Sequence, residues 1–431
     1  MSGNTTYRKI KLRLIPTKEQ EELMWKHVHA SRFIYNWGLE RWYSNLDNGI
    51  KNTTSNKLSK ELKTVKQENP WLKEVSNKTL VKSLQVLEFN MKRFFKKQIK
   101  RPKFKSSKSS IPSFKTRTET KWGNKHLPNI EGDRVRLEKL KLVKLSSKIT
   151  KSMKEKNINP VFYSSTIYYD GKYWYISLAY KVEKQDKKEL TNETIGIDLG
   201  IKSLATCSNG KSYKNINKSS KVKKLEKQLK RKQRQVSRKY EMNKDKLRIY
   251  HLDREGKPIK TKSGLYKTSL LKTKNIIKLE KEIRLLHRRL KNIRNNHIHT
   301  LTKEIVEQYP QEIVIEDLKI NNMLKNKHLS KQISKCNWYE IRRQLTYKCE
   351  DRGILLTVAN TYYPSSQTCS NCENRLTKQD KLSLKDRTFN CKTCNSSLDR
   401  DLNASINLMN YKYSKWYQNY VESKWNTLYN M

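Results

Sequence analysis

Residues 369–401 contain the pattern Cys369-Ser-Asn-Cys372, eighteen further residues, Cys391-Lys-Thr-Cys394, and the acidic segment Asp399-Arg-Asp401. Two Cys-x-x-Cys pairs at this spacing are typical of a zinc site, because Zn²⁺ takes four ligands at the corners of a tetrahedron. We therefore expect Cys369, Cys372, Cys391 and Cys394 to hold one structural Zn²⁺ with no open position. Four free thiols or two disulfides are the alternatives, and the paired spacing argues against both.

Three carboxylates outside the cysteine pairs form a second candidate metal site. Asp401 precedes an apolar helical run at residues 404–409, Asp198 lies in the β-prone run Thr194-Ile-Gly-Ile-Asp198, and Glu316 ends the run Glu312-Ile-Val-Ile-Glu316. A carboxylate in a buried strand costs several kcal/mol unless it is paired with a cation or a metal. Mg²⁺ takes such oxygen ligands, and two Mg²⁺ ions about 3.5–4 Å apart activate water against a phosphodiester. Each acid alone has an alternative role in a salt bridge or a turn, but the three together favour a two-Mg²⁺ site.

The charge of the chain narrows the class of partner. Lysine and arginine number 94 against 41 acidic residues, a formal charge of +53 over 431 residues. Such a surplus favours a polyanion, bound in a salt-sensitive way. A ribosomal-type or nonspecific basic protein is the alternative, and a genome-wide preference for lysine explains part of the excess. The sequence contains no glycine-rich phosphate loop, which argues against an ATPase.

The length predicts two to four domains. No apolar run approaches the ~20 residues of a membrane helix, and the N-terminal segment lacks the apolar core of a signal peptide. The three cysteines outside the paired motifs, Cys207, Cys336 and Cys349, are expected to be buried or neutral thiols. These features predict a cytoplasmic protein with no membrane partner.

The N-terminal half predicts strands with a helical insertion. Residues 7–15 alternate as an amphipathic strand, residues 16–100 carry helical spacing, and residues 133–182 return to strands with an Asp170-Gly171 hairpin turn. We expect these strands to form a β-barrel. In the basic segment 100–115, Phe104 and Phe114 could each stack on a base or fill a core. A charged linker at residues 183–192 marks a domain boundary.

The C-terminal half predicts a strand hairpin at Asn209-Gly210, followed by two helices with apolar seams at residues 222–236 and 276–293. We expect a helical hairpin lying along a nucleic-acid duplex; a coiled coil for dimerisation is the alternative. Residues 354–358 predict a buried strand, and the aromatic tail at 411–431 either caps the core or stays mobile. The basic residues that flank the helical seams are Lys230, Arg231, Arg234, Arg284, Arg288 and Arg289.

The motifs resemble those of the TnpB family, the RNA-guided nucleases of bacterial insertion sequences, and of the related compact type V CRISPR effectors. The similar stretches begin at Gly196-Ile-Asp198, Ile315-Glu316, Tyr363-Pro-Ser-Ser-Gln-Thr-Cys369 and Asp399-Arg-Asp401-Leu-Asn403. The resemblance implies an RNase H-like RuvC domain with Asp198, Glu316 and Asp401 as catalytic acids and Mg²⁺ ligands. It departs from the family at Glu373 and Asn395, where glycine is usual, which predicts a strained or differently shaped knuckle at Cys372. Asn296 stands where the family often has Asp, which leaves no role assigned to it.

The resemblance also implies partners and a location. They are a guide RNA encoded near the element, double-stranded target DNA with a short adjacent motif, and a transposase encoded by the same element. The barrel would grip the RNA and, with the helical module, read the adjacent motif. The protein is then expected to be bacterial, cytoplasmic and nucleoid-associated.

Together these observations predict an α+β multidomain protein that cleaves DNA as an RNA-guided, Mg²⁺-dependent endonuclease. The expected domains are a barrel (1–15 and 101–190), a helical recognition module (16–100), a RuvC-like nuclease (191–364 and 398–431) and a zinc-binding insertion (365–397). Alternatives are an RNA-independent transposase or recombinase accessory protein, a compact CRISPR effector, and an RNA-guided repressor without cleavage.

Overall fold

The computed structural model describes residues 5–107, 111–116, 128–146, 162–183, 188–246, 248–252, 256–260, 264, 266, 268–377, 379–380, 382–383 and 386–429. The chain divides into two units, residues 1–184 and 185–431, and each unit has hydrophobic cores of its own. No described helix is both long and apolar enough to cross a membrane.

The N-terminal unit contains a seven-stranded antiparallel sheet with β1 (Thr5–Ile15) near its middle. Leu12 and Leu14 of β1 are buried, whereas Lys11 and Arg13, which alternate with them, lie over tyrosine rings. This is the alternation that residues 7–15 predicted. In sheet order, the other strands are β2 (Ser113–Thr116), β6 (Phe162–Tyr169), β7 (Trp174–Glu183), then beyond β1 β5 (Lys141–Leu145), β4 (Arg134–Leu137) and β3 (Asn129–Glu131).

The predicted barrel is not closed among the described residues, which is a correction. The strand order runs from β2 to β3 without a pairing between these two edges. The edge strands contain four and three residues, so each offers few backbone groups for a closing ladder. The hairpin at Asp170-Gly171 joins β6 to β7 as predicted, with Gly171 at φ 97°.

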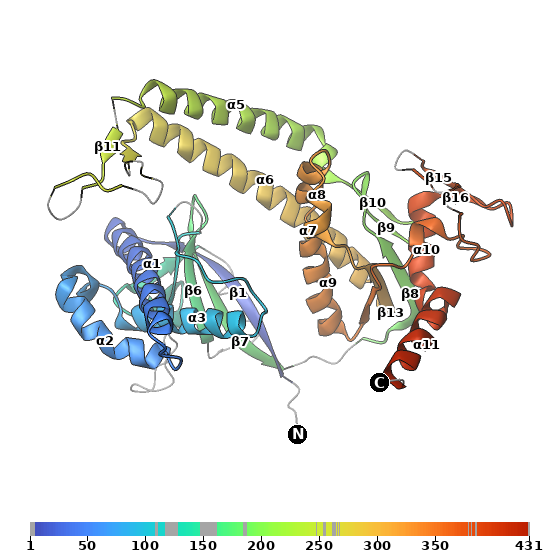
Figure 1. Ribbon diagram of the computed structural model, residues 1–431, viewed down its shortest axis with the longest axis horizontal. Coiled ribbons are helices and arrows are strands. Elements are labelled where there is room, and N and C mark those ends of the chain that lie inside the picture. The colour runs from blue at the N-terminus through green and yellow to red at the C-terminus, as the bar shows by residue number, and fades with distance from the viewer. Residues whose placement is uncertain are drawn as a thin grey trace. The chain divides into compact units, whose positions relative to one another are not determined.

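The helices of the N-terminal unit confirm the helical run predicted within residues 16–100. α1 (Lys18–Asp47) begins at Thr17, whose side chain and that of Gln20 form a reciprocal capping box. The first turns of α1 pack on the sheet, and the rest packs with leucines of α2 (Ser55–Glu68) and α3 (Asn77–Phe95). Figure 1 shows these three helices grouped together.

The C-terminal unit is built on a five-stranded mixed sheet in the order β10-β9-β8-β13-β14. β8, β13 and β14 are parallel, and the Asn209-Gly210 turn connects antiparallel β9 and β10. β14 was predicted to be buried, but Leu355 is 52% exposed, because β14 is an edge strand with one neighbour. The strands are β8 (Thr191–Asp198), β9 (Ser203–Cys207), β10 (Ser212–Lys214), β13 (Pro310–Glu316) and β14 (Leu355–Ala359).

Helices cover both faces of this sheet. α6 (Lys274–Val306) and α9 (Trp338–Arg352) pack on one face, against a core that includes Ile195, Ile197, Ile313 and Ile315. α10 (Arg400–Met409) packs on the opposite face, where Leu408 contacts Val314 and Tyr411. The predicted neutral thiols Cys207, Cys336 and Cys349 are all buried.

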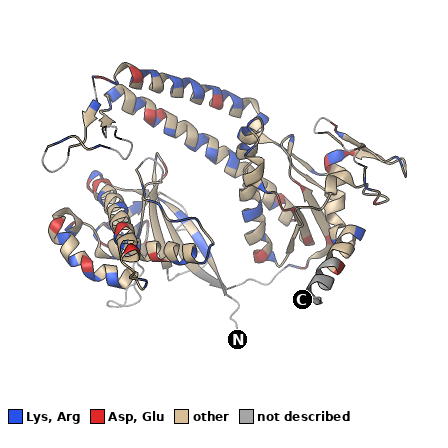
Figure 2. Ribbon diagram, in the orientation of Figure 1, with Lys and Arg blue, Asp and Glu red and all other residues tan. Residues whose placement is uncertain are grey.

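α5 (Ser220–Met242) and the first half of α6 form the predicted helical hairpin. Val222, Leu225 and Leu229 meet Leu286 and Leu290 along its seam. Lysine and arginine residues recur along both helices (Figure 2), and Lys230, Arg231, Arg234, Arg284 and Arg289 are exposed. The hairpin ends in the short strands β11 (Arg248–Tyr250) and β12 (Thr268–Leu270).

The shorter elements complete the two units. The tail forms α11 against Tyr411, which favours the capping interpretation of the tail over a mobile one. These elements are η1 (Pro70–Lys73), η2 (Ile216–Lys218), α7 (Ile320–Met323), α8 (Ser330–Cys336), η3 (Ser365–Gln367), β15 (Thr388–Asn390), β16 (Ser397–Asp399), η4 (Tyr411–Tyr413) and α11 (Lys415–Tyr429).

Candidate active site and cysteine clip

Asp198 and Glu316 occupy the carboxyl ends of adjacent parallel strands. Ile197 of β8 lies opposite Ile315 of β13, so the next residue of each strand is an acid. Side chains alternate between the faces of a sheet. Because Ile197 and Ile315 face the core under α6 and α9, both acids lie on the opposite face, the face that α10 covers.

Gly196 brings α10 onto this face. A Cβ atom at Gly196 would lie 2.0 Å from the Ser405 carbonyl oxygen and 2.3 Å from the Met409 nitrogen, so the helix backbone rests directly on β8. Asp399 caps the N-terminus of α10 by accepting hydrogen bonds from the Asp401 and Leu402 amides. Asp401 therefore stands in the first turn of a helix that is held against the strand of Asp198.

The three acids influence one another electrostatically. Burial raises the pKa of Asp198 well above its ordinary value, and a hydrogen bond to Glu316 together with the charges of Glu316 and Asp401 raises it further. Arg400 acts in the opposite direction. Like charges held this close favour protonation or a bound cation. We refer to Asp198, Glu316 and Asp401 as the carboxylate site.

The oxygen donors of the carboxylate site fit Mg²⁺, which takes hard oxygen ligands. Among the described residues, the group of three or more potential ligand side chains whose ligand atoms all lie within 4.8 Å of one another is the set of four cysteines.

Asp317, directly after Glu316, anchors this end of β13. Its carboxylate accepts hydrogen bonds from Lys319 (2.5 Å), Thr361 (2.8 Å) and Arg342 (2.9 Å). These bonds lower the pKa of Asp317 to about 2. The anion therefore ties the chain after Glu316 to α9 and to the end of β14.

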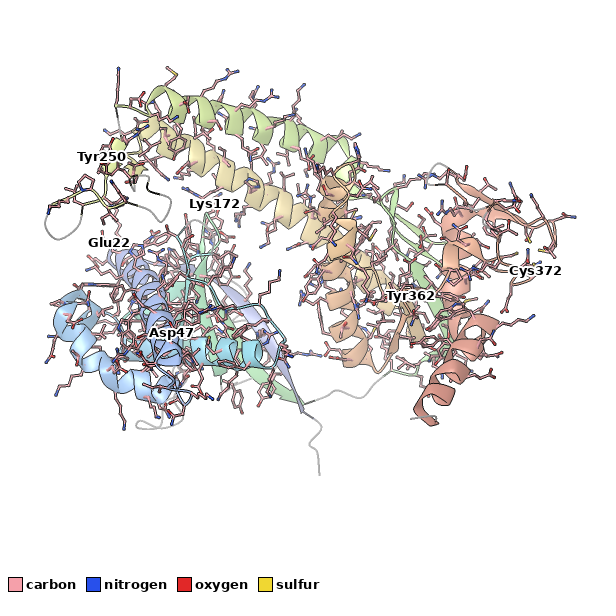
Figure 3. The ribbon with its side chains drawn as sticks, viewed as in Figure 1. Glu22, Asp47, Lys172, Tyr250, Tyr362 and Cys372 are labelled. Carbon is pink, nitrogen blue, oxygen red and sulfur yellow. The ribbon has the colours of Figure 1, made fainter. Side chains whose placement is uncertain are left out.

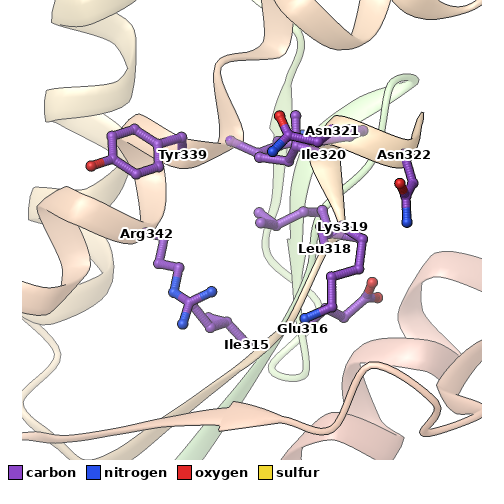
Figure 4. Close-up of a pocket in the computed structure, with 11 residues that line it drawn as sticks. Ile315, Glu316, Leu318, Lys319, Ile320, Asn321, Asn322, Tyr339 and Arg342 are labelled. Carbon is purple, nitrogen blue, oxygen red and sulfur yellow. The ribbon is translucent and has the colours of Figure 1, made fainter. Parts of the chain in front are cut away.

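A cavity of about 550 Å³ opens beside Glu316. Figure 4 shows Tyr339 and Arg342 on one side of it and Asn321 and Asn322 on the other. Tyr339 is 68% exposed. An exposed aromatic ring and an arginine thus border the cavity that Glu316 lines.

The four predicted zinc ligands converge, and we call Cys369, Cys372, Cys391 and Cys394 the cysteine clip. Their sulfur atoms all lie within 4.8 Å of one another, with Cys369 and Cys394 3.6 Å apart. A hydrogen bond from Ser396 lowers the pKa of Cys394 to about 5, which favours the thiolate that binds metal. The donor set, four convergent sulfur atoms, fits Zn²⁺.

The knuckles of the clip keep a matched shape without glycine. Glu373 and Asn395 both adopt a left-handed backbone, with φ of 57° and 54°. Glu373 also accepts a hydrogen bond from the Lys415 amide. The predicted departure at Cys372 is therefore not a change of shape, although Glu373 occupies a conformation that disfavours a side chain. Figure 3 labels Cys372 in this clip and the 84%-exposed Tyr362 after β14.

Two buried asparagines join the cysteine clip to α10. The Asn403 amide donates to the Thr368 carbonyl (2.8 Å), and its oxygen accepts from the Ser370 backbone amide (2.9 Å). Asn407 donates to the Thr368 and Ser365 carbonyls. Asn403 is fully buried, so these bonds have no competition from water. The clip thereby fixes the helix that carries Asp401.

Some residues that shape the site were not singled out from the sequence. Gly196 and Asn403 lay inside the quoted motifs, and Asp317 lay next to Glu316, but no spacing rule assigns them a contact. Of the two uncertain aromatics, Phe114 is buried in the core and Phe104 is 58% exposed.

Three family models match the chain in order. They are described as "Helix-turn-helix domain" (residues 1–51), "Probable transposase" (177–327) and "Cas12f1-like, TNB domain" (338–408). The first of these covers β1 and the single long helix α1 in this structure. The third covers α9, the cysteine clip and most of α10.

Similar proteins extend along almost the whole chain. The "Putative RNA-guided DNA endonuclease InsQ" of Escherichia coli K12 is 28% identical over 417 residues, covering 93% of this chain and 90% of that protein. A "Putative RNA-guided DNA endonuclease" of Streptomyces pristinaespiralis is 29% identical over 407 residues, covering 93% and 88%.

The fold also has a solved counterpart. A cryo-EM structure of a Cas12f1–sgRNA–target DNA complex matches with a TM-score of 0.53 at 14% identity, covering 95% of this chain and 99% of that one. The chain thus has a Cas12f1-like α+β fold. The ordered family models and the relatives that extend along most of the chain confirm the resemblance to the TnpB family that its motifs predicted.

Proposed function

We propose that this protein is an RNA-guided DNA endonuclease of the TnpB type, with a single RuvC-like active site formed by Asp198, Glu316 and Asp401. Full-length relatives carry names of this activity. The sheet order β10-β9-β8-β13-β14, with three antiparallel strands followed by two parallel ones, supports an RNase H-like domain.

The observation that carries the proposal is the shared environment of the three acids. Asp198 hydrogen-bonds Glu316, and the charge of Asp401 raises the pKa of Asp198. In the chain, 118 positions separate Asp198 from Glu316, and 85 separate Glu316 from Asp401. Carboxylates that repel one another in this way are costly without a cation. A structural salt bridge would instead pair each acid with a base, as Asp317 is paired.

The reaction would be phosphodiester hydrolysis. Two Mg²⁺ ions bound there would supply a metal-activated water and stabilise the leaving oxygen. Asp198 and Glu316 would hold one edge of the site from rigid strands, and Asp401 would close it from the first turn of α10. Tyr339, with Arg342, would guide the strand towards Glu316. The cysteine clip would hold one structural Zn²⁺.

The basic surface supports nucleic-acid partners. Exposed arginines and lysines on α5 and α6 suit the backbone of a guide RNA–target DNA heteroduplex, which proteins hold mainly through phosphates. Target choice would then come from base pairing with the guide. The division proposed is 1–15 with 101–190 for RNA and DNA binding, 16–100 for recognition, 191–364 with 398–431 for cleavage, and 365–397 for zinc.

The decisive experiment compares Asp198→Ala with Glu304→Ala in the protein purified with its co-expressed RNA. Glu304 is the control acid: it forms a surface ion pair with Lys211 (3.2 Å), and such pairs contribute little to folding stability. We expect Asp198→Ala to lose cleavage of a target plasmid by at least about 10³-fold in Mg²⁺, while target binding remains. Equal cleavage by the two variants would refute the assignment.

An RNA-independent role in transposition is the second candidate, because one matched family model carries the description "Probable transposase". The two candidate functions differ in whether the protein binds and requires an RNA. A discrete RNA that co-purifies with the protein from its host and is required for cleavage supports the guided nuclease. Cleavage or strand transfer by RNA-free protein supports the alternative.

A further inference from the structure

A second cavity, of about 600 Å³, lies in the N-terminal unit, between α1 and η1. One stripe of α1 lines it at helical spacing, from His29 through Phe33 to Trp37 and Glu40, and Trp71 of η1 forms the opposite wall. Figure 3 labels Glu22 and Asp47 near the two ends of α1. The cavity lies outside the carboxylate site and the cysteine clip.

The aromatic walls of this cavity are held in position. The ring centroids of Phe33 and Trp71 are 5.6 Å apart in an edge-to-face arrangement. Leu72 is fully buried in the core that η1 shares with α1, and Glu74, directly after η1, forms an ion pair with Lys26 of α1. Trp71 nevertheless remains 37% exposed. A rigid and accessible indole beside a hollow is a surface prepared for stacking.

A basic strap, residues 101–105, runs beside the cavity. Asn36, which lines the cavity, donates to the Lys105 carbonyl (3.0 Å) and accepts from the Lys105 amide (2.8 Å). Tyr43 donates to the Pro102 carbonyl, and the Arg101 guanidinium lies 4.2 Å from the Tyr43 ring centroid. The strap therefore presents exposed Arg101 and Lys103 from a fixed backbone.

Arg32 at the cavity and the exposed cations of the basic strap favour a ligand that combines a flat ring with phosphates. Arg32 lines the cavity and makes no ion pair among the described residues. Glu40 adds an acceptor that can read donor groups on the polar edge of a ring. An aromatic slot with a free guanidinium and a basic track matches a nucleotide: a base for the slot and phosphates for the track.

We propose that this cavity binds one unpaired nucleobase of a single strand, stacked on Trp71, with its backbone continuing over the basic strap. The ligand follows from the partner class in the proposed function, but the site is independent of cleavage. The base could belong to RNA or to a locally opened DNA strand, and the two share the same stacking chemistry.

The test measures binding by full-length protein that carries Asp198→Ala, so that cleavage plays no part. The probes are fluorescein-labelled 12-nucleotide oligouridine RNA, oligothymidine DNA and a 12-base-pair duplex. We expect Trp71→Ala to weaken binding of a single strand by about tenfold and of the duplex by less than twofold. Trp71→Phe should restore most of the affinity, because a ring remains.

Two controls separate stacking from general loss. Phe89→Ala removes a 61%-exposed aromatic of α3 and should leave all three affinities unchanged. Lys103→Ala should reduce the salt dependence of single-strand binding by about 0.7 in slope, whereas Trp71→Ala should leave the slope unchanged. If Trp71→Ala melts at a lower temperature than the parent, Arg32→Gln replaces it, with the same expected preference for single strands.

Photocrosslinking locates the base directly. A 5-iodouridine or 5-iododeoxyuridine probe should crosslink to the peptide that contains Trp71. If Trp71→Ala weakens binding of the RNA single strand alone, the base belongs to RNA. If it weakens binding of the DNA single strand alone, the base belongs to DNA. Either result supports the proposed cavity. Crosslinks only outside α1 and η1, or equal losses on single strands and duplex, would overturn the proposal. Neither result would bear on cleavage, which the Asp198 and Glu304 variants test separately.

Discussion

The cysteine clip and the carboxylate site are two candidate metal sites built in opposite ways. The clip gathers four side chains from 26 consecutive residues, 369–394, into a cluster whose sulfur atoms lie within 4.8 Å of one another. The carboxylate site gathers three from strands and a helix spread over residues 198–401, and its members repel one another. One site is specified by local spacing and the other by the register of a sheet.

The difference matters because the local site supports the distant one. Asn403 and Asn407 of α10 hydrogen-bond the backbone beside Cys369, and the absence of a side chain at Gly196 allows α10 to pack directly on β8. A structural metal would thus fix one wall of a catalytic site with which it shares no ligand. Each of the following experiments breaks or sharpens one part of this relation.

Gly196→Ala should cause the largest loss of cleavage, because it displaces the helix that carries Asp401 while all three acids stay in the chain. A new Cβ 2.0 Å from the Ser405 carbonyl must push α10 away from β8. We expect cleavage to fall by about 10³-fold and the free energy of unfolding by about 1–3 kcal/mol. Plasmid cleavage and urea denaturation measure the two.

Gly38→Ala is the matched control for that substitution. Its Cβ would meet the tip of the Leu84 side chain at 2.6 Å, which can move, rather than a backbone atom. It should cost less stability and leave cleavage intact. Unchanged cleavage by Gly196→Ala would contradict the contact between α10 and β8.

Cys391→Ser should remove the clip metal and leave the carboxylates in place. Three remaining sulfur ligands hold Zn²⁺ poorly, and a structural zinc contributes folding energy outright. We expect bound zinc, measured by inductively coupled plasma mass spectrometry, to fall from one per chain to near zero, with cleavage reduced about 100-fold. Asp198→Ala should keep its zinc. A chain that cleaves normally without zinc would separate the two sites.

Asn403→Asp tests the link between the sites. The carboxylate retains the acceptor for the Ser370 amide, but it loses the donor to Thr368 and adds a charge at a fully buried position. We expect zinc to stay bound and cleavage to fall about 10- to 100-fold, with about 1–3 kcal/mol of stability lost. Asn410→Asp, at the other end of α10, should change neither quantity appreciably.

Mg²⁺ should stabilise the wild type more than Asp198→Asn. A ligand present at ten times its dissociation constant adds about 1.4 kcal/mol to the free energy of unfolding. Without divalent cations, Asp198→Asn should be the more stable of the two proteins, because the neutral amide relieves the repulsion between the carboxylates. Thermal melts with and without Mg²⁺ measure both effects, and equal shifts for the two proteins would count against a cation at this site.

The smallest expected effect is a change in stability with pH that comes from Lys348, a buried residue of α9. Burial lowers the pKa of Lys348 to about 8, and its ammonium group donates to Thr302 and to the His299 carbonyl. The folded chain therefore releases this proton before the unfolded chain does. The free energy of unfolding should rise between about pH 8 and pH 10.5.

Lys348→Met should remove that rise. Comparing urea denaturation of the two proteins at pH 7 and pH 10, we expect the wild type to gain stability relative to the variant as the pH increases. Parallel pH profiles would show that the Lys348 pKa is not depressed.

Much of this molecule was predictable because its signals are short-range. The cysteine spacing predicted the clip, alternation predicted β1, and the 3-4 spacing of apolar residues predicted the α5–α6 hairpin. The closed barrel and the buried β14 were wrong for one reason: a strand's pattern does not show how many neighbours it has. Likewise, the sequence of residues 100–115 did not show that Phe114 is core and Phe104 exposed.

The sequence by itself determined which atoms are available: four paired thiols, three acids at the ends of apolar runs, and a surplus of positive charge. Only the tertiary structure decided that the acids share one face, because that depends on the parallel register of Ile197 with Ile315 and on a helix backbone pressed against Gly196. Ligand spacing within a few residues is fixed by covalent geometry. Distances between segments a hundred residues apart are fixed by packing, which no local pattern encodes.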